Sequence, residues 1–115
     1  MQIEKQQLLL RRVKVLHTVV WVFFVGCILL IPAAAATGHF IWAAVCVGLV
    51  LLECLVLAFH AGRCPLTDVA ARLTDDRSEN FDIYLPRWLA RHNKAIFGIA
   101  FLAGSAFAVW SWMSQ

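Results

Sequence analysis

The sequence predicts an all-α membrane protein in which three helices cross the bilayer and an amphipathic cytoplasmic loop joins the second helix to the third. Of its 115 residues, 62% are hydrophobic and only 15% are charged, whereas a soluble domain is about half apolar and about a quarter charged. The apolar residues gather in three runs, residues 15–36, 40–60 and 95–113, which contain one charged residue, Glu53. Each run is close to the roughly 20 residues that cross about 30 Å of hydrocarbon as a helix.

The first two spans are expected to form an antiparallel hairpin. Residues 1–14 are typical of an amphipathic cytoplasmic lead-in, whose helix should continue into the first span. Pro32 would kink or end that helix, and Gly38 permits a sharp reversal. A basic start, an apolar run and a small-residue stretch at Pro32–Ala36 are also typical of a cleaved signal peptide. We favour a retained span, because the apolar run is long for a signal sequence and only a three-residue turn separates it from the next span.

Small residues recur four apart in two of the spans. Ala44 and Gly48 form such a pair in the second span, and Ala100, Gly104 and Ala108 continue the pattern in the third. This spacing lets helix backbones approach closely in lipid, where apolar side chains alone give no drive for association.

The loop, residues 61–94, is expected to be structured. Ala61-Gly62 predicts a bend after the second span, and Thr67 predicts the cap of a short helix through Leu73. The stretch FDIYLP, residues 81–86, predicts a short extended segment on the membrane surface. Its Pro86 suits the first position of a helix that continues into the third span.

The positive charges predict the orientation. Every Lys and Arg lies either before the first span or in the loop, so the N-terminus and the loop should be cytoplasmic and the C-terminus periplasmic. This distribution predicts a multi-pass membrane protein. The loop's basic residues are interleaved with acidic ones, which argues against nucleic acid as a partner. The expected partners are the lipid bilayer and either another membrane protein or a second copy of the chain.

Glu53 is the candidate functional acid. An ionised carboxylate facing lipid costs about 2.5 kcal/mol or more, so we expect Glu53 to be neutral and to face the other helices, where Ser105 lies at a similar depth. One interpretation is a buried hydrogen bond between spans. The alternative is a carboxylate that handles protons or binds a ligand.

His17 and His60 lie at the cytoplasmic edges of the first two spans and could hold haem b or a quinone between facing helices. Combining His60 with Glu53 or His92 gives no compact metal-ligand spacing, so no metal site is predicted. Cys27, Cys46, Cys54 and Cys64 form no CxxC pair and are interpreted as small apolar residues. The sequence has no nucleophile elbow, phosphate-binding glycine loop or HExxH motif, and no catalytic residue is predicted.

Three stretches of the chain resemble a family of small bacterial three-span membrane proteins of unknown function. They are the pair Leu16-His17, a Glu (Glu53) followed by the block Cys64-Pro65-Leu66-Thr67, and the aromatic-acidic stretch Phe81–Leu85. The resemblance implies three spans and marks His17, Glu53 and the Cys64–Thr67 block. It departs at Gly62-Arg63, where the family usually has an aromatic residue, and at Ile83, where it often has His. It implies a location in a bacterial inner (plasma) membrane, and it implies no activity.

The leading hypothesis is a non-enzymatic accessory or interaction subunit of the inner membrane. One alternative is a small membrane redox protein that binds haem b or quinone through His17 and His60. Another is a proton-coupled carrier that uses Glu53.

The charge distribution gives a direct test of topology. A reporter that is active only in the periplasm should be active when fused after Gln115 and silent when inserted within residues 74–80. The opposite pattern of activity would refute the predicted orientation.

Overall fold

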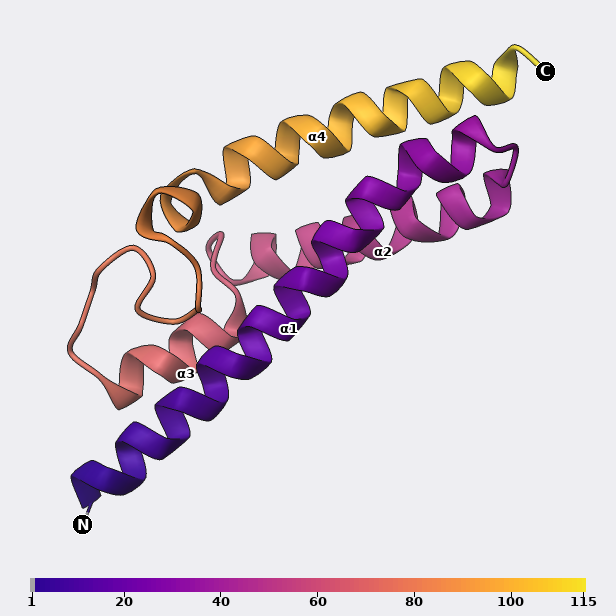
Figure 1. Ribbon diagram of the computed structural model, residues 1–115. Coiled ribbons are helices and arrows are strands. Elements are labelled where there is room, and N and C mark those ends of the chain that lie inside the picture. Colours follow the sequence, from indigo (N-terminus) through magenta and orange to yellow (C-terminus); the bar gives the residue numbers. More distant parts are fainter. Residues whose placement is uncertain (1) are drawn as a thin grey trace. The chain divides into compact units, whose positions relative to one another are not determined.

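The computed structural model describes residues 2–115 and confirms the predicted fold class. Four helices follow one another along the chain: α1 (Gln2–Ala36), α2 (Phe40–Phe59), α3 (Pro65–Leu73) and α4 (Arg87–Met113) (Figure 1). Residues 2–115 contain no β-strand. Helices α1, α2 and α4 are each long and apolar enough to cross a membrane. Helix α1 runs unbroken from the lead-in through the first span and continues one turn beyond Pro32.

The ends of α1 and α2 carry the same backbone motif. After α1, the His39 amide donates to the Ala34 carbonyl at 2.8 Å and Gly38 has φ +81°. After α2, the Gly62 amide donates to the Leu57 carbonyl at 2.7 Å, with Ala61 at φ +56°. Both are Schellman-type ends, in which a left-handed residue satisfies the last helical carbonyls. The reversal expected at Gly38 and the bend expected at Ala61-Gly62 are therefore confirmed.

The chain divides into two compact units. One, here called the loop unit, contains residues up to Trp21 together with Val56–His92, and the other, the span unit, contains Val22–Leu55 and Asn93–Gln115. The loop unit thus holds α3 and the segment that leads into α4. The span unit holds most of α2 and the apolar parts of α1 and α4.

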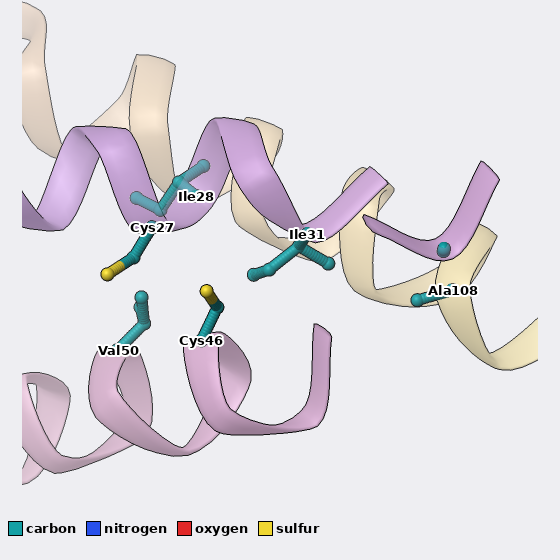
Figure 2. Packing of buried hydrophobic residues seen from close by; sticks show 7 residues of the cluster. Cys27, Ile28, Ile31, Cys46, Val50 and Ala108 are labelled. Carbon is teal, nitrogen blue, oxygen red and sulfur yellow. The ribbon is translucent and has the colours of Figure 1, made fainter. Parts of the chain in front are cut away.

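The core of the span unit is small and apolar. Its buried residues are Cys27, Ile28, Ile31, Ala35, Cys46, Val50 and Ala108 (Figure 2). Gly104 of α4 is buried against α1, and a Cβ atom there would lie 3.2 Å from Pro32 Cδ. The small residues of α4 therefore permit close helix packing, as predicted. Ala44 and Gly48 of α2 are exposed instead, and do not pack within this chain.

Large apolar side chains cover the outside of the span unit. Ile99 and Leu102 of α4 are 68% and 69% exposed, and Trp42 and Trp110 are 65% and 64% exposed. Such a surface greatly exceeds the apolar patches of soluble monomers. It suits hydrocarbon, with tryptophans of the kind that favour the membrane–water interface.

The loop unit corrects three details of the sequence prediction. Helix α3 begins at Pro65 with Cys64 as its N-cap, so Thr67 lies inside the helix. Residues 81–85 form turns and bends rather than an extended segment, and Asp82, Ile83 and Leu85 are buried. Pro86 precedes α4 as its cap and accepts a hydrogen bond from the Ala90 amide at 2.9 Å. The extended segment is replaced by turns because residues 82–84 bond to side chains of α1, and α3 starts before Thr67 because Pro65 occupies its first turn.

Packing at Gly104 should be sensitive to volume. Gly104→Leu would force a side chain against Pro32 and should lower stability in detergent by about 1–3 kcal/mol, the usual cost of overpacking. Gly98→Leu is the matched control, because Gly98 lies in the same helix with nothing within 4 Å of its Cβ position. Equal stability of the two variants would contradict this packing.

Candidate functional site

The candidate functional site is a polar cluster in the loop unit, centred on the buried residue Asp82. Asp82 is 8% exposed. Its carboxylate accepts a hydrogen bond from the Thr67 hydroxyl of α3 at 2.5 Å, and its backbone carbonyl accepts one from His17 Nδ1 of α1 at 3.0 Å. His17 Nδ1 also lies 3.6 Å from the Asp82 carboxylate. One acidic residue thereby connects α1, α3 and the segment before α4.

One face of α1 holds the segment around Asp82. Lys14, His17 and Thr18 are spaced i, i+3 and i+4, which places them together on a helix. The Thr18 hydroxyl accepts a hydrogen bond from the Tyr84 amide at 3.0 Å and donates one to the Lys14 carbonyl at 2.7 Å. Lys14 Nζ lies 4.5 Å from the centre of the Tyr84 ring, within cation–π range. Residues 82–84 are therefore held by side chains and not by a β-ladder.

The contacts of His17 assign its tautomer. A backbone carbonyl can only accept, so the hydrogen lies on Nδ1 and the Nε2 atom of the neutral ring carries a lone pair. Metal-ligating histidines are oriented in this way, with the second ring nitrogen donating to a carbonyl or carboxylate. His17 could therefore bind haem iron or accept a hydrogen bond through Nε2.

The remainder of the loop is fixed by local polar contacts. The Ser78 amide donates to Asp76 Oδ1 at 2.9 Å, and this bond, with a second from the Ser78 side chain, lowers the pKa of the Asp76 carboxyl. This contribution to stability is present above the carboxyl's unfolded-state pKa and is lost as the pH falls through the lower folded-state value. Arg77 donates to the carbonyls of Ala71 and Thr74 and lies over the Phe81 ring.

Three stretches that the sequence singled out separately meet at Asp82. His17 comes from the Leu-His pair, Thr67 from the Cys64–Thr67 block, and Asp82 itself from the aromatic-acidic stretch. In that block, Cys64 is the N-cap without a side-chain cap bond, Pro65 opens α3, and Leu66 is half-buried. Asp82 was not among the predicted site residues, although it lies in the aromatic-acidic stretch of the resemblance.

The other predicted residues lie elsewhere. His60 is exposed just after the end of α2. Glu53 is half-buried in the span unit and has an interaction partner. Its expected bond to Ser105 is absent, because Ser105 Oγ is buried with no hydrogen-bond partner among the described residues. Residues 2–115 contain no group of three or more His, Cys, Asp or Glu side chains that could hold a metal ion.

No family model, curated protein or solved structure matches this chain. The resemblance to a three-span family stays a prediction.

Removing the Asp82 side chain should release the segment before α4. Asp82→Ala leaves the Thr67 hydroxyl without its partner and should cost about 1–3 kcal/mol, with faster proteolysis within residues 74–86. Thr67→Val, which removes one hydrogen bond and keeps the side-chain volume, should cost about 0.5–1.5 kcal/mol. Asp75→Ala, in an exposed position, is the control. Proteolysis of the Asp82 variant at the control's rate would exclude this role.

Two substitutions of Glu53 should distinguish a structural role of this residue from a proton-handling role. Glu53→Gln keeps the shape and a hydrogen-bond donor and should preserve stability, whereas Glu53→Leu should weaken helix association by about 0.5–2 kcal/mol. Stability is measured in detergent and function as a growth or transport phenotype. A stable but inactive Gln variant would favour the carrier interpretation. A Leu variant that matches the wild type in both measurements would refute both roles.

Proposed function

We propose that this protein is a bacterial inner-membrane accessory or interaction subunit without enzymatic activity of its own. Its N-terminus and loop lie in the cytoplasm and its C-terminus in the periplasm. It assembles through its spans with another membrane protein or with a second copy of itself.

One observation carries the proposal: α4 buries very little of its apolar surface within the chain. Only 6% of its most hydrophobic stretch is buried, compared with 22% for α1 and 17% for α2. Its buried contacts come from the small residues Gly104 and Ala108. In lipid, helix association depends on packing and on hydrogen bonds, so a span with so few internal contacts is available to a partner. The exposed pair Ala44 and Gly48 on α2 offers a second face for close helix approach.

Site-specific photo-crosslinking in native membranes tests this function. A photoreactive residue at Leu102 or Ile99 should give one discrete protein adduct, identified by mass spectrometry as a partner or a second copy. The same residue at position 8 of the lead-in, which is exposed outside the predicted span, is the control. Adducts with lipid alone from both Leu102 and Ile99 would contradict the proposed role as an interaction subunit.

The geometry of His17 favours a second candidate function, a small redox protein that holds haem b. The Asp82 carbonyl is bonded by His17 Nδ1, so this bond does not use Nε2. Nε2 of His17 and a ring nitrogen of His60 would be the two ligands. Protein purified from haem-supplied cells should then show a haem absorption band that is lost in His17→Ala and kept in His92→Ala. A band that is unchanged in His17→Ala, or missing from the wild type, excludes this candidate.

A further inference from the structure

Two cysteines from different helices meet in the core of the span unit. Cys27 of α1 and Cys46 of α2 are 6% and 8% exposed. Both sulfur atoms lie in the interface between the two helices, close to Val50 (Figure 2). Both thiols belong to the same buried cluster, and both are free rather than disulfide-bonded. A disulfide bond between these two cysteines would link α1 to α2.

The surroundings of the pair restrict which reagents can reach it. The buried cluster around the thiols consists otherwise of aliphatic residues, including Ile28, Ile31 and Val50, and has no charged member. Buried thiols in apolar surroundings are normally inert, because the thiolate is disfavoured there. An oxidant that reaches this pair from the membrane must itself be soluble in lipid.

A groove leads to one of the two thiols. Its volume is about 410 Å³, within the range of small-molecule sites. Cys46 and Trp42 of α2 line it together with Thr37 and His39 of the turn, and Leu and Ala side chains of α1 complete its wall. Cys46 is thus both the neighbour of Cys27 and part of the groove surface.

His39 gives the groove a defined polar group. The Thr37 hydroxyl donates its hydrogen to the carbonyls of Ala33 and Ala34, at 3.0 and 3.1 Å. The same oxygen also lies 2.8 Å from His39 Nδ1, within hydrogen-bond distance. Because Nδ1 takes part in this contact, Nε2 is the ring nitrogen left for another hydrogen bond.

We propose that Cys27 and Cys46 are a redox-active dithiol, which a lipid-soluble quinone bound in this groove oxidises to an intramolecular disulfide. Two S–H bonds break and one S–S bond forms. The two electrons and two protons released reduce the quinone to a quinol, so the step needs no other reactant. A quinone fits the groove because its ring is apolar and can stack on Trp42, and because its oxygen atoms can form a hydrogen bond with His39 Nε2.

The test uses the full chain, reduced and purified in detergent without oxygen. Duroquinone is a suitable probe, because its fully substituted ring resists thiol addition. We expect one quinol per chain, a protein lighter by two hydrogen atoms, and loss of two of the four free thiols. Peptide mapping should place the new bond between Cys27 and Cys46. A sample without quinone should keep all four thiols.

Matched variants localise the reaction. Cys27→Ser and Cys46→Ser should each abolish quinol formation, whereas Cys54→Ser, on the exposed side of α2, should react as the wild type does. Quinol formation that persists in both Ser variants, or a wild type that keeps four thiols, would overturn the proposal.

Filling the groove tests the route. Ala34→Phe should slow the quinone reaction by about tenfold, equivalent to losing about 1.4 kcal/mol of binding. Val45→Phe, at an exposed position of α2 outside the groove lining, should not. His39→Ala gives a second test that leaves the groove's packing intact, and it should also slow the reaction. Wild-type rates in both groove variants would show that the quinone does not act from this site.

Discussion

The burial of one carboxylate determines how the loop unit is organised. A buried carboxylate is costly unless its oxygens are bonded, and removing a partner leaves that cost uncompensated. The Asp82 carboxylate meets this constraint because it accepts a hydrogen bond from the Thr67 hydroxyl and lies 3.6 Å from His17 Nδ1. Both partners come from helices far from it in sequence. The buried position of Asp82 therefore depends on α1 and α3 together.

The span unit is stabilised by different physics. In lipid an apolar side chain gains nothing by leaving hydrocarbon, so close contact between backbones has to supply the packing energy. Gly104 lies against Pro32, and Ala35, Ala43 and Ala108 are buried with it in this unit. Pro32 has a further consequence here. It lacks the amide that would bond the carbonyl one turn earlier, yet α1 continues past it, which suits a position held by a neighbouring helix.

The helices were predictable from the sequence and the polar cluster was not. Runs of about 20 apolar residues determine a membrane helix with little help from tertiary contacts, so α1, α2 and α4 follow from hydropathy. Gly38 marked the turn because its left-handed backbone is costly for other residues. The bond between His17 and Asp82 joins residues 65 apart, and no local pattern encodes such a pair. The predicted bond between Glu53 and Ser105 was wrong for a related reason. Counting helical turns gives the depth of a residue in the membrane but not the direction in which its side chain points.

The same limit explains how the cysteines were interpreted. Spacing along the chain shows only that Cys27 and Cys46 form no local pair, and composition favours apolar filling. Their contact arises because the reversal at Gly38 makes α1 and α2 antiparallel, which returns Cys46 toward Cys27 across the hairpin (Figure 2). Cys54 lies on the same helix as Cys46 but is exposed. The presence of a cysteine in α2 therefore does not by itself tell a buried thiol from an exposed one. Chemistry at this pair would depend on the turn as much as on the cysteines, because the turn both aligns the thiols and supplies His39 to the groove beside them.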